Sequence, residues 1–312
     1  MARRKGRQID GILLLDKPSG MTSNRALRRV SRLLDARKAG HTGSLDPLAT
    51  GLLVLCFGEA TKISGWLLDA DKQYVATARL GVTTDSADAD GTVLEQRPVP
   101  DLDDDALDSV LGRFRGEIEQ VPPMFSALKH QGRRLHELAR EGIVVDREPR
   151  RVIIHGLAGR WVAPDRIELR VDCTKGTYIR SLVSDIGECL GCGAHVEALR
   201  RTALGPFREP VMWRLEDLED KASSGPEALD EHLLPPDQAL IDHPAAVLPA
   251  GGAPAFCQGQ AVSPATALAP ESVTATLLRV YSDTGAFLGI GRADDDGAVA
   301  PRRLLVQRSS GG

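Results

Sequence analysis

The chain has 312 residues, of which 42% are hydrophobic and 26% charged, a composition typical of a folded globular protein rather than a disordered or fibrous one. It contains no apolar run near the roughly 18 residues that a membrane-spanning helix needs. The apolar run at residues 12–15 is too short for a signal peptide, so we expect a cytoplasmic protein with no membrane partner.

The net charge of −4 is distributed unevenly. Residues 1–72 hold 13 Lys and Arg against 7 Asp and Glu, whereas residues 213–312 hold 7 against 14. Phosphate groups respond to a local patch rather than to the total charge. The basic first quarter of the chain therefore indicates a polyanionic partner.

Residues 11–16 are predicted to form a short strand that ends in a turn at residues 18–20. Thr22 or Ser23 can cap the helix that follows. One face of this helix is apolar, and the other carries Arg25, Arg28, Arg29 and Arg32. Such a basic stripe is either a solvated face or an RNA contact, and the residues alone leave both possibilities open.

The most unusual segment is GHTGSLDPLATG at residues 40–51, which contains a single carboxylate, Asp46. Pro47 fixes its own backbone and favours an extended conformation for Asp46, so the carboxylate is held rather than free. A turn-forming role and a catalytic role both remain open on these grounds. The segment lacks the spacing and the lysine of a P-loop.

Strands are predicted at residues 52–56, 74–80 and 167–173, the last with strict alternation of apolar and polar residues. A turn at residues 175–177 leads into a helix with Ile179, Leu182, Val183 and Ile186 on one face. A strand, a glycine-containing turn and a helix N-terminus together make a suitable place for a functional side chain.

Two further motifs are interpreted as having no functional role. Asp85, Asp88 and Asp90 are interpreted as an acidic surface turn, because their spacing does not fit a calcium loop. Cys189 and Cys192 form one CxxC pair with no second pair to complete a zinc site, so we expect no metal.

The C-terminal third is predicted to be a separate unit. Residues 219–238 contain glycine, serine and a Pro-Pro pair, and are interpreted as a boundary or linker. Beyond about residue 245 the chain is glycine-rich with short β-like runs at residues 274–281 and 286–290. These runs indicate a small β domain.

Several motifs, in this order along the chain, resemble the TruB family of pseudouridine synthases. Beyond residues 40–54 (GHTGSLDPLATGLLV), they are LDKPSGMTS at residues 15–23, GEATK at 58–62, CTKGTYIRSL at 173–182 and LRR at 199–201. The resemblance implies an α+β fold in which residues 1–240 form a catalytic domain with a large, mainly antiparallel sheet and a central cleft. It further implies an RNA-gripping insertion at about residues 122–151 and a PUA-like RNA-binding domain at residues 245–312.

The same resemblance implies roles for individual residues. Asp46 corresponds to the catalytic aspartate, Arg180 would pair with it and hold it ionised, and Tyr74 would stack on the target uracil. His41 would enter the RNA loop, Tyr178 would lie near the detached base and the sugar, and Leu199 would line the pocket. The resemblance also implies substrate-binding roles for Lys17, Lys129 and Arg133.

The implied activity is the isomerisation of the T-loop uridine (uridine 55) of tRNA to pseudouridine, by base flipping, glycosidic bond cleavage and rejoining through carbon. The resemblance implies neither cofactor nor metal. We expect a monomer that binds the T stem-loop of tRNA with no obligatory protein partner. Two alternatives are an RNA-guided synthase of the same superfamily, and an RNA-binding tRNA folding factor whose catalysis is incidental.

Overall fold

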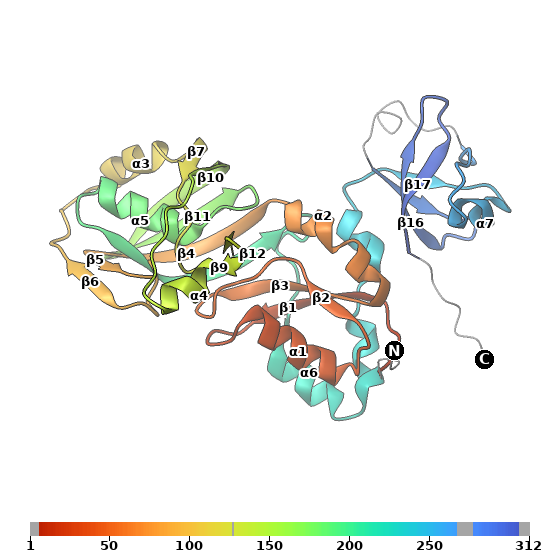
Figure 1. Cartoon of the computed structure of the whole chain (residues 1–312), viewed down its shortest axis with the longest axis horizontal. Coiled ribbons are helices and arrows are strands. Elements are labelled where there is room, and N and C mark those ends of the chain that lie inside the picture. Colours follow the sequence, from red (N-terminus) through yellow and green to blue (C-terminus); the bar gives the residue numbers. More distant parts are fainter. Residues whose placement is uncertain (1–5, 127, 267–276, 306–312) are drawn as a thin grey trace.

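A computed structural model describes residues 6–126, 128–266 and 277–305 and contains one large sheet (Figure 1). Its strands are β1 (Gly11–Lys17), β2 (Ala39–His41), β3 (Thr50–Phe57), β4 (Lys72–Leu80), β7 (Gly116–Gln120), β10 (Arg150–Ala163), β11 (Arg166–Cys173), β12 (Ala194–Leu204) and β13 (Trp213–Arg214). The order is β13-β1-β3-β12-β4-β11-β10-β7, with β2 also paired to β3. Only the β1–β13 and β3–β12 pairings are parallel, so the prediction of a large, mainly antiparallel sheet is confirmed.

Helices pack against the sheet through a shared apolar core. They are α1 (Ser23–Leu33), α3 (Asp104–Gly112), α5 (Ile179–Cys189) and α6 (Leu215–Ala222). Helix α1 begins as predicted, because the Thr22 side chain accepts a hydrogen bond from the Arg25 amide. Its residues Ala26 and Val30 share the core with Leu182 and Val183 of α5. Within the described residues, no helix is long and apolar enough to cross a membrane.

In the middle of the sheet, buried and more exposed residues alternate along the strands as the sequence predicts. Strand β4 buries every second residue from Lys72 to Leu80, and its neighbour β11 buries Ile167, Leu169 and Val171. Side chains on alternate positions of a strand point to opposite faces. Tyr74, Ala76 and Ala78 therefore face the core that contains the helices.

The two halves of the sheet meet at one narrow contact. Strands β3 and β12 pair only at Thr50 with Arg200 and at Gly51 with Arg201. Gly51 has φ +91°, and a Cβ placed there would lie 2.3 Å from the carbonyl oxygen of Arg201. Glycine is required because any side chain would both strain the backbone and separate the strands.

A second sheet lies at the C-terminal end of the chain, drawn in blue in Figure 1. It consists of β14 (Ala245–Val247), β15 (Leu278–Tyr281), β16 (Phe287–Ala293) and β17 (Val299–Leu304), with α7 (Gly252–Cys257) beside it. Phe256 and Val280 belong to its own core. Phe287 and Ile290 pack instead with residues on the far face of β1 and β3. Residues 274–276 of the predicted strand, and residues 306–312 of the predicted domain, lie outside the described residues.

Residues 219–238 were interpreted as a boundary or linker, and the linker alternative is wrong. This segment contains the end of α6, the 3-10 helix η2 (Pro226–His232) and the start of the 3-10 helix η3 (Pro236–Leu240). Pro226 and Pro236 stand at the starts of these helices, where a proline needs no amide hydrogen. Leu229 is fully buried in the main core, so the prolines begin packed structure rather than end it.

We predict that Gly51→Ala lowers the free energy of unfolding by about 3 kcal/mol, because the new methyl group meets the Arg201 carbonyl at a positive φ. Urea denaturation would measure the loss. Gly116→Ala is the matched control, since Gly116 has φ +86° with no atom within 4 Å of its Cβ position and should lose only about 1 kcal/mol. Equal losses in the two variants would contradict the close-approach explanation.

Candidate active site

Asp46 lies in the loop that joins β2 to β3. Leu45 and Ala49 are buried on either side of it and fix the loop, while the Asp46 side chain remains 40% exposed. The buried Ser23 hydroxyl accepts a hydrogen bond from the Leu45 amide (2.8 Å) and donates one to the Leu45 carbonyl (3.1 Å). The N-terminus of α1 therefore holds the residue that precedes the carboxylate.

Lys17, at the end of β1, is fully buried beneath this loop. Its ammonium donates to the carbonyl oxygens of Pro18 (2.8 Å), Met21 (2.7 Å) and Pro47 (3.3 Å). Burial lowers the pKa of Lys17 to about 8. Sequence analysis placed Lys17 among the substrate-binding residues. In this conformation the ammonium binds backbone instead and has no surface through which to contact RNA.

Asp46 forms an ion pair with Arg180 in the first turn of α5. The Arg180 Nε lies 2.9 Å from Asp46 Oδ2 and 3.6 Å from Asp88 Oδ2. The guanidinium also donates to the carbonyls of Ser86 (2.8 Å) and Phe125 (2.7 Å). Arg180 is buried, so these four acceptors fix its position and orient the carboxylate.

The pKa of the Asp46 carboxyl is raised above its ordinary value. Burial is the largest cause and the charge of Asp88 adds to it, while Arg180 and Lys17 act in the opposite direction. Arg180 acts in the direction that the resemblance implied, favouring the ionised carboxylate, but burial outweighs it in the net direction. Sequence analysis could anticipate neither this burial nor the added charge of Asp88.

Tyr74 and Leu199 lie on neighbouring strands of the same sheet. Tyr74 is buried on β4, and burial raises its pKa. Leu199 is buried on β12, directly across from Ala76. His41, the last residue of β2, is partly buried, which lowers its pKa, and the positive charge of Arg201 lowers it further.

Tyr178 stands at the N-cap position of α5, two residues before Arg180. The Gln120 side chain fixes its backbone, accepting from the Tyr178 amide (3.0 Å) and donating to the Tyr178 carbonyl (3.3 Å). The Tyr178 ring is partly buried, and burial raises the pKa of its hydroxyl. Tyr178 thus shares with Arg180 the turn that faces Asp46.

Lys129 and Arg133 lie on a small hairpin of the insertion, apart from this cluster. The hairpin consists of β8 (Lys129–His130) and β9 (Arg133–Arg134) and is followed by α4 (Leu135–Arg140). Both side chains are exposed, and Arg133 forms an ion pair with Glu141. The same insertion reaches the cluster through the Phe125 carbonyl that binds Arg180.

Asp88 and Arg201 are site residues that sequence analysis missed. The acidic surface turn expected at residues 85–90 is wrong for Asp88, which is buried and paired with Arg180. An acidic turn has the same pattern whether it is solvated or paired, so the sequence held no signal for Asp88. Arg201 did have a signal: it stands two residues after Leu199 on one strand, and so on the same face.

A basic stripe is exposed on α1. Arg25, Arg28 and Arg32 are exposed, and none of them makes an ion pair with a described residue. Arg29 differs, because it forms an ion pair with Glu219 of α6. By contrast, Arg160, Arg166 and Arg170 on β10 and β11 all have acidic partners.

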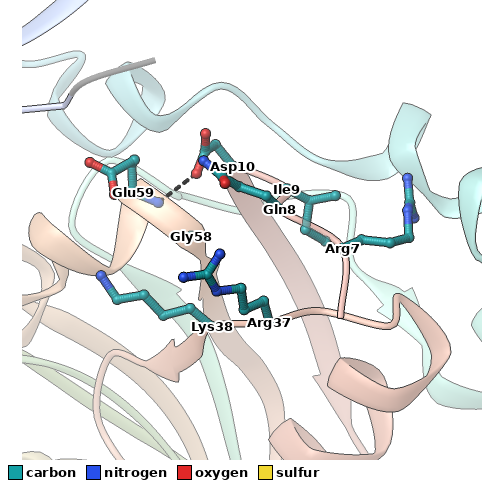
Figure 2. A pocket seen from close by; sticks show the side chains of 8 residues that line it. All are labelled: Arg7, Gln8, Ile9, Asp10, Arg37, Lys38, Gly58 and Glu59. Carbon is teal, nitrogen blue, oxygen red and sulfur yellow. Dashed lines mark hydrogen bonds between the residues drawn. The ribbon is translucent and has the colours of Figure 1, made fainter. Parts of the chain in front are cut away.

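A separate cavity of about 160 Å³ lies between the start of β1, the residues before β2 and the end of β3 (Figure 2). Arg37 and Lys38 extend into it from one side, and Asp10 and Glu59 lie on the other. The eight residues of β3, at about 3.3 Å each, separate this end from the Asp46 loop by roughly 25 Å. Its opposed charges favour neither an anion nor a cation, so it is not part of the candidate site.

The cluster therefore combines one half-exposed carboxylate, a buried guanidinium that orients it, and two aromatic rings. A carboxylate in this setting can act as a nucleophile or as a base. Aromatic rings can stack on a flat heterocycle. Within the described residues, no group of three or more His, Cys, Asp or Glu side chains is placed to hold a metal ion.

Three families of known proteins match successive parts of the chain. Residues 31–179 match "TruB family pseudouridylate synthase (N terminal domain)", residues 180–241 match "tRNA pseudouridylate synthase B C-terminal domain", and residues 244–305 match "Pseudouridine synthase II TruB, C-terminal".

Curated relatives match over nearly the whole chain. The tRNA pseudouridine synthase B of Ectopseudomonas mendocina is 53% identical and covers 97% of this chain and 97% of its own length. That of Nitrosococcus oceani is 51% identical over 98% of each chain. Among solved structures, a chain of a Cbf5-Nop10-Gar1 complex is 26% identical with a TM-score of 0.72, covering 95% of this chain and 85% of that one. The similarity in three dimensions identifies the pseudouridine synthase fold.

We predict that Asp46→Asn stabilises the protein slightly at pH 7, by at most about 1 kcal/mol because the carboxylate is partly exposed and screened. A carboxyl whose pKa is raised on folding binds its proton more tightly in the folded state, so its charge destabilises the fold once the pH exceeds that pKa. Urea denaturation at pH 3 and pH 7 would measure the difference, which should disappear at pH 3. A variant less stable than the wild type at pH 7 would contradict this sign.

Proposed function

Because this chain belongs to the TruB family of pseudouridine synthases, an isomerase family that converts uridine in tRNA to pseudouridine, we propose that its target is uridine 55 in the T loop. The observation that carries this proposal is the half-exposed Asp46, held 2.9 Å from the buried Arg180 at the turn that also carries Tyr178. No cofactor is needed for the reaction we propose.

The target nucleotide must leave the stacked RNA loop before its glycosidic bond can be reached. Extrusion of a base costs a few kcal/mol of stacking and pairing energy. Stacking on an aromatic side chain returns part of this energy. Tyr74 supplies such a ring beside the Asp46 loop, and Leu199 adds an apolar contact from the neighbouring strand. His41 would occupy space that the extruded nucleotide leaves.

The isomerisation exchanges one bond for another on the same base. The bond from C1′ of the ribose to N1 of uracil breaks, the base rotates, and a bond from C1′ to C5 forms. N1 then carries a proton, and the hydrogen on C5 is lost to solvent. Asp46 is the carboxylate that acts in this sequence, and Arg180, fixed by Asp88 and two carbonyls, keeps it oriented toward the nucleotide.

Exposed cations on two elements would hold the tRNA. Arg25, Arg28 and Arg32 of α1 lack acidic partners among the described residues, which leaves their charges available to phosphates. Lys129 on the insertion is also exposed and would contact the T stem-loop from a second element. The paired Arg133 would first have to exchange Glu141 for a phosphate.

We further propose that the chain works as a monomer in the cytoplasm, without guide RNA or an obligatory protein partner. Relatives of tRNA pseudouridine synthase B match it at 51–54% identity, whereas the Cbf5 chain solved with Nop10 and Gar1 matches at 26%. A second activity as a tRNA folding factor is favoured by one observation: Arg25, Arg28 and Arg32 of α1 are exposed, have no acidic partner among the described residues, and lie outside the Asp46 cluster.

Pseudouridine formation should be abolished by Asp46→Asn. We expect tritium release from tRNA labelled at uracil C5 only where the T-loop uridine is present, because C5 must lose its hydrogen to bond to C1′. The variant should release tritium at least about 10³-fold more slowly than the wild type, with tRNA binding unchanged. Tight binding by a wild type that releases no tritium would overturn the proposed function. Release from a transcript in which only the T-loop uridine is replaced would contradict the choice of target.

The arginine stripe of α1 should account for part of the salt dependence of tRNA binding. Replacing Arg25, Arg28 and Arg32 with Gln should reduce the slope of log K against log salt by about 2 to 3, since each phosphate contact contributes about 0.7 to 0.9. Filter binding at several salt concentrations would give the slope. The matched control replaces Arg160, Arg166 and Arg170, which are paired with acids, and should leave the slope unchanged. An unchanged slope in the α1 variant would mean that this stripe is a solvated face.

A further inference from the structure

Arg201 is a fully buried arginine at the junction between the two halves of the sheet. Its backbone pairs with Gly51 of β3 on one side and with Tyr74 of β4 on the other. The strand that carries it, β12, is therefore in contact with both the Asp46 loop and the strand that presents Tyr74.

The Arg201 guanidinium binds backbone rather than a carboxylate. Its Nε donates to the Leu52 carbonyl (2.7 Å) and its Nη2 to the Gly43 carbonyl (3.1 Å). In the described parts of the chain it makes no ion pair, whereas the other buried arginine, Arg180, has two carboxylate partners. Burying a cation without a counter-ion is costly, so holding these two carbonyls requires a compensating benefit.

The two bonds constrain the loop that carries Asp46. Gly43 lies three residues before Asp46 and has φ +103°. Leu52 lies just beyond the other end of the loop, on β3. Arg201 therefore ties the start of the loop to the strand that follows it.

The same guanidinium acts on Tyr74. Cross-strand partners on adjacent strands place their side chains on one face of the sheet. Arg201 and Tyr74 are such partners, and the positive charge of Arg201 opposes the rise in the Tyr74 pKa that burial causes. The ring and the loop thus share one fixed neighbour.

We propose that Arg201 is a positioning residue for the isomerisation: by binding the Gly43 and Leu52 carbonyls beside Tyr74, it holds the carboxylate of Asp46 and the ring in register on one nucleotide. Arg201 itself touches neither the base nor the sugar. The inference rests on the proposed function, because it assigns a role within that reaction.

A purely structural role would have different consequences. Loss of a structural contact lowers stability and weakens tRNA binding together. Loss of positioning lowers the rate of the chemical step while the fold and the affinity remain, since a displacement of about 1 Å can reduce a rate by roughly 100-fold. Lysine separates these cases, because its compact ammonium keeps the charge but lacks the planar fork that reaches two carbonyls at once.

The test compares Arg201→Lys and Arg201→Gln with the wild type. For each we would measure the urea midpoint, the Kd for unmodified tRNA and the single-turnover rate of tritium release. Steady-state kinetics would give kcat and KM. The control is Arg200→Lys, because Arg200 points to the other face and forms a bidentate pair with Asp16. We expect Arg201→Lys to fold, to bind tRNA within about twofold of the wild type, and to react about 10 to 100-fold more slowly with KM unchanged. Arg200→Lys should react at the wild-type rate even if its midpoint falls.

Three results would overturn the inference. Arg201→Lys could react within twofold of the wild type, or its loss of rate could be matched by an equal loss of affinity. Arg201→Gln could retain the full rate although it keeps neither the charge nor the fork. A wild type that forms no pseudouridine would overturn the proposed function as well, whereas an active wild type with an equally active Arg201→Lys would overturn this inference alone.

Discussion

The ion pair between Asp46 and Arg180 is the interaction on which the rest of the site depends. The carboxylate comes from the loop between β2 and β3, and the guanidinium comes from α5, more than 130 residues later in the chain. Asp88, from a third segment, binds the same guanidinium. The sheet brings these segments together, because β12 joins β3 to β4 at its centre. A fold that misplaced β12 would separate β3, and with it the Asp46 loop, from β4.

The surroundings of this pair are strongly cationic, although the chain as a whole carries a net charge of −4. Lys17, Arg180 and Arg201 are buried near it, against two acidic groups, Asp46 and Asp88, one of them half-exposed. Burial lowers the pKa of Lys17 and of Lys72 to about 8, which indicates how costly these charges are inside the fold. Backbone carbonyls, fixed before substrate arrives, supply most of their compensation.

The fold could be predicted largely from local patterns. Alternation in β4 and β11 and the cap of α1 at Thr22 follow from periodicity and side-chain chemistry, and both are present. Residues 219–238 were misjudged because proline begins a short helix as readily as it ends one, and only the burial of Leu229 decides between them. In the site, Asp46 and Arg180 were found through motifs. Asp88 could not be, because its partner is 92 residues away and its own turn resembles a solvated one.

The second sheet is attached to the first by more than a peptide connection. Phe287, Ile290 and Leu305 complete an apolar layer with Ile12 and Val54 on the face of β1 and β3 opposite the helices, and Lys62 donates to the Leu304 carbonyl. The C-terminal region thus shares part of its apolar core with the large sheet. Deleting it would expose the residues of this shared core to water, so the two parts should unfold as one cooperative unit. Evolutionary loss or exchange of this region would then require a simultaneous change in the apolar residues that share this core.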